Sequence, residues 1–293
     1  MQTITTTILI LCAINSVMAQ RYSETEKREI AFEKRSAGNV FYLANISGGI
    51  KVEAYNGEKI LLEARKTVKA KTEERLARSK TELSLGIIDR LDTIIVYIKG
   101  PCGQFGNKNR LYGRKNGKGW SYDWGNCEYD YDFKYDFTIK VPANMNLYLA
   151  TINEGNVEVT GVKGSLDVNN VNGAITLKQI SGKTNAHTIN GDVNLEYNTL
   201  PKESSSYYTL NGDINAFYPK GLRADMTFKS FNGDFYTNIE KLEYKTAVVE
   251  KKKTGKSDGL AYHVDSRSAI SVGGGGVSLD FETFNGDVFV KEQ

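Results

Sequence analysis

The sequence predicts an all-β protein: a β-solenoid of stacked two-sided coils, each about 18–21 residues long, with an N-terminal β-sheet region and one short helix. Two observations favour this fold class. Tyr (17) and Phe (12) are plentiful while Pro (4) is scarce, as is typical of β structure. Glycines recur at a constant interval, at positions 155, 164, 173, 182 and 191, and Asn-Gly pairs recur at twice that interval.

The glycine repeat sets the geometry of the predicted coils. Residues two and four places after each glycine are mostly apolar, as in an alternating strand. Residues seven places after, such as Val162, Val171, Ile180 and Ile189, are apolar too. A straight strand cannot place positions four and seven on one face, so the chain must turn a corner between them. This favours a solenoid over a meander of flat hairpins.

A longer sequence period combines two of the glycine intervals. Asn-Gly pairs recur 18 residues apart at first and then 21 apart, so each period is one two-sided coil. A 53-residue step, which covers an excursion, leads to the last pair, Asn285-Gly286. The asparagines are expected to stack as an amide ladder: Asn172, Asn190, Asn211, Asn232 and Asn285. We expect the strand Asp287 to Lys291 to form one end of the stack, and the N-terminal half to cap the other.

An aspartate follows four of these turns, and these residues are candidate ligand-binding side chains: Asp192, Asp213, Asp234 and Asp287. One interpretation is a ladder that binds calcium or a sugar. The alternative is that each carboxylate accepts hydrogen bonds from local backbone amides and keeps the corner hydrated.

The N-terminal region is predicted to contain several strands. Residues 20–36 are charged and are expected to begin loosely. Residues 49–55 and 60–68 flank Asn56-Gly57, which predicts a hairpin because Asn-Gly accepts positive φ at both turn positions.

One short helix and more strands follow. The helix is expected over residues 71–80, with strands at 83–88 and 93–99. Residues 129–141 alternate aromatic and polar side chains, which predicts a strand with one buried aromatic face, ended by Pro142.

A long loop separates Cys102 from Cys127, and the pair predicts a disulfide in an oxidising compartment, with free or buried thiols as the alternative. Trp120, Tyr122 and Trp124 alternate within this loop. They are candidates for stacking on a carbohydrate, or else for a cap folded over the core.

Positions 1–19 predict a secretory signal peptide. They carry no charged side chain, their apolar run is too short to span a bilayer, and Val17 and Ala19 precede a cleavage site before Gln20. The absence of Lys and Arg here departs from the usual pattern, and Leu11 argues against a lipoprotein site at Cys12. No later apolar stretch approaches the length that a membrane-spanning helix needs. The mature chain is therefore expected to lack a transmembrane segment and to be exported, whether periplasmic, on the outer surface or secreted.

Three segments together resemble a known family. They are residues 135–147, the Phe-Asn-Gly-Asp segment 228–237, and the closing segment 273–290. They resemble the bacterial "putative adhesin" family with β-strand repeats, a group of exported domain-of-unknown-function proteins. The resemblance covers roughly residues 40–291 and implies a β-solenoid-like fold and an envelope or surface location. It implies no catalytic residues.

The chemistry of catalysis is poorly represented. His187 and His263 have no nucleophile elbow nearby, and two cysteines with two histidines lack zinc-site spacing. A net charge of +3 predicts no nucleic-acid binding. We therefore expect no catalytic residues, metal or cofactor.

These observations lead to one functional hypothesis. After the signal peptide (1–19), residues 20–141 form an N-terminal β region and residues 142–293 the solenoid. The expected function is that of a non-catalytic exported scaffold that binds an envelope or surface protein or glycan. The alternatives are a polysaccharide-active enzyme and an envelope-stress accessory protein. Exposed end strands would allow oligomers to form.

Overall fold

The computed structural model describes residues 20–293 except 35, 37, 102–103, 109–118, 124–128, 246–248, 254–259 and 265–267. For residues 104–108, 119–123, 249–253 and 260–264 it describes the backbone alone. The predicted signal peptide and both cysteines of the predicted disulfide lie outside the described residues.

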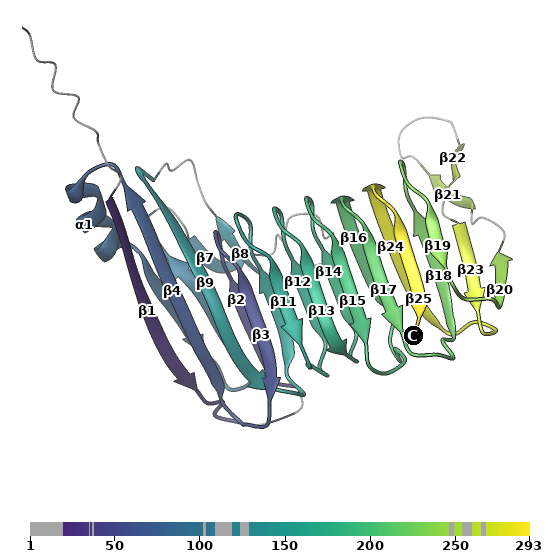
Figure 1. Cartoon of the computed structure of the whole chain (residues 1–293), viewed down its shortest axis with the longest axis horizontal. Helices are drawn as coiled ribbons and strands as arrows, with labels where there is room; N and C mark the ends of the chain where they lie inside the picture. The colour runs from purple at the N-terminus through teal and green to yellow at the C-terminus, as the bar shows by residue number, and fades with distance from the viewer. Residues whose placement is uncertain are drawn as a thin grey trace, which may run out of the picture.

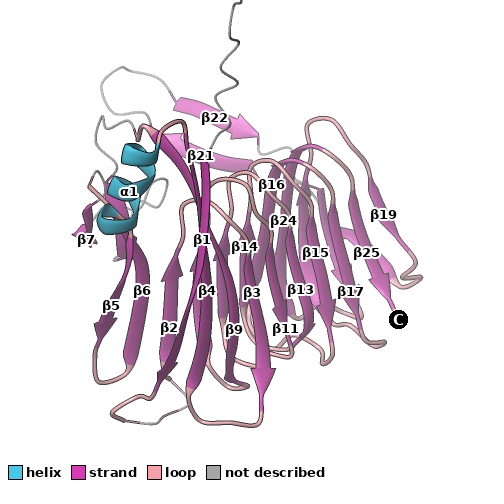
Figure 2. Ribbon diagram, turned by 60° about the vertical axis from the view of Figure 1, so that its left-hand side comes forward, coloured by secondary structure: helices cyan, strands magenta, loops and turns pink. Residues whose placement is uncertain are grey.

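Two long sheets face one another along an extended stack, as Figures 1 and 2 show. The first sheet has the strand order β1 (Gln20–Ile30), β4 (Ile60–Ala70), β9 (Tyr131–Pro142), β3 (Ile50–Tyr55), β11 (Val157–Thr160), β13 (Ile175–Ile180), β15 (Val193–Tyr197), β17 (Ile214–Tyr218), β25 (Val288–Glu292) and β19 (Phe235–Thr237). The second has the order β20 (Leu242–Lys245), β23 (Ser268–Val272), β18 (Ala224–Lys229), β24 (Val277–Asn285), β16 (Ser205–Asn211), β14 (Thr184–His187), β12 (Leu166–Asn169), β10 (Asn146–Ala150), β2 (Val40–Ala44), β6 (Thr93–Lys99) and β5 (Ser84–Asp89).

Smaller elements lie beside the two sheets. They are the helix α1 (Glu73–Glu82) and the strand pairs β7 (Gln104–Lys108) with β8 (Gly119–Asp123) and β21 (Val249–Lys253) with β22 (Leu260–Val264). No helix among the described residues is long and apolar enough to cross a membrane.

The core is built from equivalent residues of successive coils in parallel register. Val157 pairs with Ile175, Ile175 with Val193, and Val193 with Ile214, and all four side chains are buried. Positions two and four after each glycine of the repeat thus point inward, as predicted. Stacking like residues in register buries a continuous apolar column between the sheets. This confirms the β-solenoid.

The prediction for position seven is wrong in half of the corners. Val162 and Ile180 are buried, but Val171 and Ile189 are partly exposed. At these two corners the preceding residue turns inward instead, because its polar side chain bonds a glycine carbonyl. Asn170 Nδ2 donates to Gly155 O at 2.9 Å, and Thr188 Oγ1 donates to Gly173 O at 2.9 Å. The solenoid therefore has one apolar and one polar kind of corner.

The hairpin expected across Asn56-Gly57 is also wrong. β3 and β4 do not pair with each other, because β9 lies between them. β9 pairs in parallel with β3, where Phe137 meets Ile50, and antiparallel with β4, where Phe137 meets Ala64. The long aromatic strand therefore supplies hydrogen bonds to both neighbours and separates them.

The C-terminal coil does not form the end of the stack, contrary to prediction. β24 and β25 lie between the β16–β17 coil and the β18–β19 coil, and Figure 1 shows them in yellow between two green coils. The strand that ends this side of the first sheet is β19.

The opposite end is formed by β1, which is not the loose segment expected from its charges. β1 pairs with β4 along its whole length, from Gln20 opposite Ala70 to Ile30 opposite Ile60. The glutamates of β1 form ion pairs with basic side chains. Glu24 forms an ion pair with Lys66, whose Nζ is buried and also donates to Leu83 O at 3.1 Å. The Lys66 ammonium lowers the pKa of Glu24.

Candidate functional site

A ladder of asparagine side chains runs along one corner of the stack. Each side-chain amide nitrogen donates to the side-chain carbonyl oxygen of the asparagine in the neighbouring coil. The pairs are Asn172 to Asn153 (3.1 Å), Asn190 to Asn172 (2.8 Å), Asn211 to Asn190 (2.8 Å), Asn285 to Asn211 (2.8 Å) and Asn232 to Asn285 (2.7 Å). The predicted amide ladder is present. Its order differs from the sequence order, because the inserted C-terminal coil places Asn285 before Asn232.

The four candidate aspartates form a second ladder beside it. Asp192 Oδ1 accepts from the backbone N–H of Asp213 at 2.9 Å, Asp213 Oδ1 from that of Asp287 at 2.8 Å, and Asp287 Oδ1 from that of Asp234 at 2.8 Å. One oxygen of three of these carboxylates therefore bonds the backbone of the next coil. Among the described residues, no group of three or more His, Cys, Asp or Glu side chains is placed to hold a metal.

The glycines between the two ladders allow the coils to approach closely. Gly191 has φ +148°, and a Cβ atom built on it would lie 2.5 Å from the carbonyl carbon and oxygen of Gly173. A side chain would therefore collide with the backbone of the preceding coil, so glycine is required at position 191. Beneath the turn, the buried Thr209 hydroxyl donates to Gly191 O at 2.8 Å.

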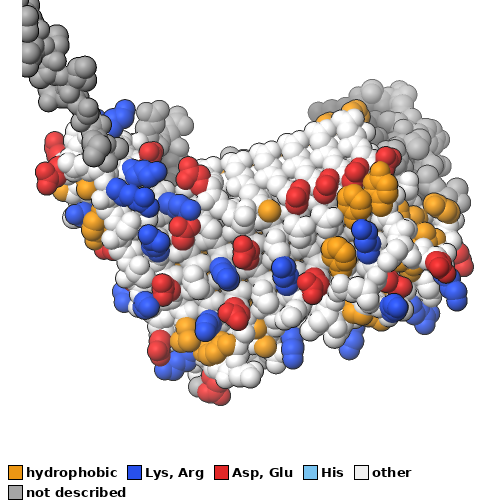
Figure 3. Space-filling model, in the orientation of Figure 1, with side chains coloured by type: hydrophobic (Ala, Val, Ile, Leu, Met, Phe, Trp, Pro, Cys, Tyr) orange, Lys and Arg blue, Asp and Glu red, His pale blue; other side chains and the backbone are white. Residues whose placement is uncertain are grey.

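Two aromatic stacks flank the ladders at the C-terminal side. Phe231 stacks on Phe284 with ring centroids 4.8 Å apart, and Tyr236 stacks on Phe289 at 4.9 Å. Phe231 is 74% exposed and Tyr236 is 45% exposed. We call this surface the ladder corner, and define it by Phe231, Asn232, Asp234, Tyr236, Phe284, Asn285, Asp287 and Phe289. Figure 3 shows a row of acidic side chains beside hydrophobic ones toward this end of the molecule.

The ladder corner is electronegative around its tyrosine. The charges of Asp287 and Asp234 raise the pKa of Tyr236. Its phenol, like that of any tyrosine at neutral pH, is protonated and can donate a hydrogen bond. Lys291 Nζ lies 5.5 Å from the centre of the Phe289 ring. The corner therefore offers ring faces, side-chain amides, carboxylates and a hydroxyl on one continuous surface.

The aromatic members of the ladder corner were not among the candidates from sequence. A signal for them exists, because the pattern aromatic-Asn-Gly-Asp-x-aromatic occurs at residues 231–236 and again at 284–289. Pairing the two segments requires knowing that coils far apart in the sequence are neighbours. The sequence spacing does not reveal this.

The aromatic loop candidates lie elsewhere. Trp120 and Tyr122 fall on β8, which pairs antiparallel with β7 so that Trp120 is opposite Asn107. Their side chains and all of Trp124 lie outside the described residues. A carbohydrate or capping role for this loop stays a prediction.

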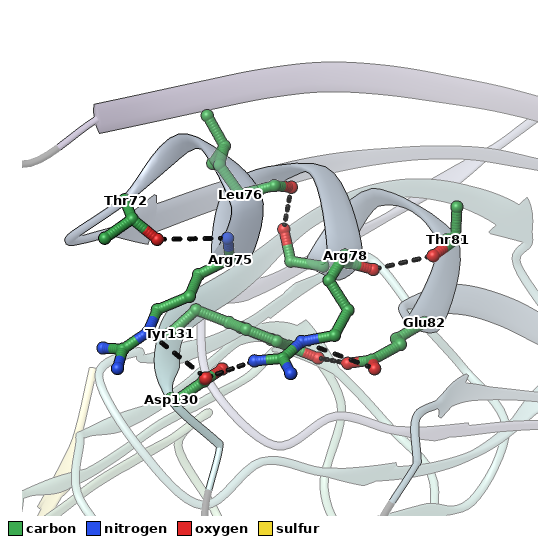
Figure 4. Close-up of polar contacts among 9 residues, drawn as sticks. Thr72, Arg75, Leu76, Arg78, Thr81, Glu82, Asp130 and Tyr131 are labelled. Carbon is green, nitrogen blue, oxygen red and sulfur yellow. Dashed lines mark hydrogen bonds and ion pairs between the residues drawn. The ribbon is translucent and has the colours of Figure 1, made fainter.

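A charged cluster at the N-terminal end has a structural role. Figure 4 shows Arg75 and Arg78 of α1 reaching Asp130, just before β9, while Tyr131 donates to Glu82 at 2.7 Å. The Arg78 guanidinium lowers the pKa of Asp130. These contacts fasten α1 onto β9.

The helix begins slightly later than predicted. Thr72 caps it by accepting from Arg75 N–H at 3.3 Å, so α1 begins at Glu73 rather than at Lys71. It ends at Glu82 rather than at Lys80.

His187 lies on β14 against Tyr208, with ring centroids 4.4 Å apart. His263 lies on β22, where only the backbone is described.

Comparison with known families finds a match to part of the chain. Residues 143–268 match the family described as Toastrack DUF4097. This match confirms the resemblance to a domain-of-unknown-function family. No curated protein matches the chain.

Three solved structures match the chain at low identity and with TM-scores below 0.5. A "putative cell adhesion protein" from Clostridium sporogenes is 10% identical, with 94% of this chain and 100% of that chain covered and a TM-score of 0.42. A "putative adhesin" from Bacteroides fragilis is 10% identical, with 92% and 97% covered and a TM-score of 0.38. A "putative lipid binding protein" from Parabacteroides distasonis is 9% identical, with 92% and 96% covered and a TM-score of 0.24.

Proposed function

We propose, from the premise that residues 143–268 match the Toastrack DUF4097 family, that this protein is a non-catalytic scaffold that binds a protein or glycan partner through the ladder corner. The scaffold is the solenoid itself, whose stack holds each side chain in register with the next. The premise supplies no ligand, so the proposal rests on the chemistry of the surface.

The exposed aromatic stacks carry this proposal. Phe231 and Phe284 are 74% and 44% exposed although both are large and apolar. Large exposed apolar side chains gathered into one patch typically mark a binding surface, whereas single ones need no explanation. Aromatic side chains beside polar groups are also common anchors of interfaces and of sugar recognition.

The arrangement of the carboxylates argues for binding rather than hydrolysis. Glycoside hydrolysis needs two carboxyl groups that face one another across the substrate. The aspartates of the ladder corner instead follow one another along one edge, and Asp287 Oδ1 is occupied by the Asp234 backbone amide at 2.8 Å. This spacing suits repeated hydrogen bonds to a partner lying along the edge.

We also propose that the protein is exported. This rests on the predicted signal peptide, whose cleavage after Ala19 would leave Gln20, the first residue of β1, at the new N-terminus. N-terminal sequencing of the protein recovered from the outside of the producing cell checks this. A chain that keeps Met1 would contradict it.

Binding can be tested with purified protein on a glycan array and on intact cell surfaces. The double variant Phe231→Ser/Tyr236→Ser should lose at least about tenfold in affinity, because it removes two exposed rings of the corner. The matched control is Tyr244→Ser, since Tyr244 is 81% exposed but lies on β20 outside the corner. Equal binding by all three proteins would contradict the site. Turnover of a glycan by the wild type would contradict the non-catalytic function.

A further inference from the structure

Within the described part of the chain, the first sheet ends at β19 with an unpaired strand edge, while the second sheet continues past β18 with β23 and β20. Val288 N–H donates to Asp234 O at 2.9 Å, so the backbone groups of the even-numbered residues here face β25. Backbone groups alternate along a strand, and those of Phe235 and Thr237 therefore point to the other side. Among the described residues, none pairs with that side of β19.

The ladders of the corner stop at the same edge with unused groups. In the preceding Asn-Gly coils the turn glycine donates its N–H to the asparagine carbonyl of the next coil, as from Gly191 to Asn211 O (2.9 Å) and from Gly286 to Asn232 O (2.9 Å). Gly233 N–H has no such acceptor among the described residues. Asn232 donates to Asn285 at 2.7 Å, but no described amide donates to its own Oδ1.

The aromatic stacks are open on the same side. Phe284 covers one face of Phe231, and Phe289 covers one face of Tyr236. The high exposure of Phe231 (74%) compared with Phe284 (44%) indicates that its second face is free. The backbone, the amide ladder and both ring stacks thus all end where one more strand of the first sheet would continue them.

The edge also lacks the basic and proline residues that often block strand pairing, and β19 itself is short, with three residues. Edge strands are typically protected by Lys, Pro or inward-pointing charges. β1, at the opposite end, carries Lys27 and Arg28, whereas residues 231–237 read Phe-Asn-Gly-Asp-Phe-Tyr-Thr, without Lys, Arg or Pro.

We propose that the β19 edge is a strand-addition site for an extended segment of a partner protein. The segment adds in parallel register and carries Asn-Gly-Asp between two aromatic residues. This inference rests on the proposed binding function and names its partner class. The segment's asparagine amide donates to Asn232 Oδ1, its asparagine carbonyl accepts from Gly233 N–H, and its aromatic side chains cover Phe231 and Tyr236.

A second copy of this chain does not provide that segment. Both of its aromatic-Asn-Gly-Asp-x-aromatic segments, 231–236 and 284–289, are already built into the stack. Its opposite end is β1, which contains no Asn-Gly, and pairing of two β19 edges about a twofold axis would be antiparallel and would not continue the ladders.

A peptide of residues 281–290, Phe-Glu-Thr-Phe-Asn-Gly-Asp-Val-Phe-Val, tests the inference, because this segment already pairs with the other side of β19. Labelled peptide titrated with the intact chain should bind saturably, and a scrambled peptide of the same composition should not. Hydrogen exchange at the Gly233 and Phe235 amides should slow on binding. No binding of the peptide to the wild type, or no change in exchange there, would overturn the inference.

Matched variants place the peptide on the edge. Thr237→Pro removes an N–H that points to the free side, and should weaken binding by at least about tenfold. Thr237→Val loses the same hydroxyl, which accepts from Ile239 N–H at 3.1 Å, but keeps the N–H and should bind as the wild type does. Equal binding by the Pro and Val variants would overturn the edge site. If Thr237→Pro does not fold, Asn232→Ala, which removes the exposed ladder acceptor, should weaken binding several-fold, and unchanged binding would overturn the inference.

The outcome separates this inference from the function on which it rests. If the peptide does not bind but the protein still binds cells or glycans through the ladder corner, only the strand-addition site is wrong. Failure of both removes the binding function as well.

Discussion

The side-chain amide of Asn232 donates to Asn285 Oδ1 at 2.7 Å, although the preceding Asn-Gly turn in the sequence is at Asn211. Asn211 instead donates to Asn190 and accepts from Asn285, both at 2.8 Å. The C-terminal coil has therefore taken the place beside β16 and β17 that sequence order would give to β18 and β19. The same ladder chemistry joins all three coils.

Replacing Asn285 by Ala should destabilise the protein by about 1–3 kcal/mol, since two side-chain hydrogen bonds are lost at about 0.5–1.5 kcal/mol each. The loss is in the middle of the ladder, where Asn285 both donates and accepts. Urea unfolding measures the change. Asn198→Ala is the control, because Asn198 is exposed and outside the ladder; an equal effect of the two variants would contradict a stabilising ladder.

Gly191→Ala should be more damaging than Gly221→Ala, although both glycines have positive φ (+148° and +88°). At Gly221 a Cβ meets nothing within 4 Å, so only the backbone strain of about 1–2 kcal/mol applies. At Gly191 the Cβ would also meet Gly173 at 2.5 Å, which adds about 1–3 kcal/mol of overpacking. Thermal unfolding of the two variants compares them directly. Equal melting temperatures would show that the coils are not in close contact at the turn.

Thr209→Val should cost about 1–3 kcal/mol despite the similar shape of the two side chains. The buried hydroxyl donates to Gly191 O at 2.8 Å, and its removal leaves that carbonyl without a side-chain donor. Thr176→Val, on the partly exposed outer face of β13, provides the control and should change the free energy of unfolding by less than about 0.5 kcal/mol. If Thr209→Val is as stable as the wild type, the hydrogen bond from Thr209 to Gly191 O does not stabilise the protein.

Alkaline pH should destabilise the protein through Tyr42. Burial, and secondarily the charge of Asp167, raise the pKa of Tyr42 to about 12, above the value of about 10 expected in the unfolded chain. The folded state therefore holds the proton more tightly, and this contribution to stability is complete below about pH 10 and is lost as the pH rises toward about 12.

Tyrosinate absorbance measured during an alkaline titration checks this, with Tyr42→Phe expected to show a shallower loss of stability above about pH 10. Asp167→Asn should lower the pKa of Tyr42 by removing the smaller of the two causes. An unchanged pH dependence in Tyr42→Phe would assign the alkaline loss to other buried tyrosines. Burial also raises the pKa values of Tyr207 and Tyr218.

The coil architecture was predictable because it depends on local periodicity. Burying Val157 and Val159 fixes the strand alternation, and repeating the pattern at Ile175 and Leu177 fixes the stacking partner. The first signal lies within one repeat, and the second needs only a comparison of adjacent repeats. The helix was predictable for a similar reason, since Thr72 and the first turn of α1 form a local cap.

The order of the coils was not predictable from those signals. Asn211, Asn232 and Asn285 carry the same Asn-Gly-Asp motif, so local chemistry does not decide which coil lies beside which. The separation of β3 from β4 by β9 has the same origin, because Asn56-Gly57 specifies a turn but not which strands pair. The aromatic ladder corner depends on this coil order and was missed with it.

The position of the inserted coil has a consequence for biosynthesis. Residues 277–292 leave the ribosome after residues 224–237, yet they lie between those residues and the rest of the stack. A nascent chain can complete β18 and β19 before their final neighbour exists. A polypeptide interrupted near residue 270 would consequently lack β24 and β25, an internal coil of the stack. The coils on either side of it would have to pack directly against each other or remain apart.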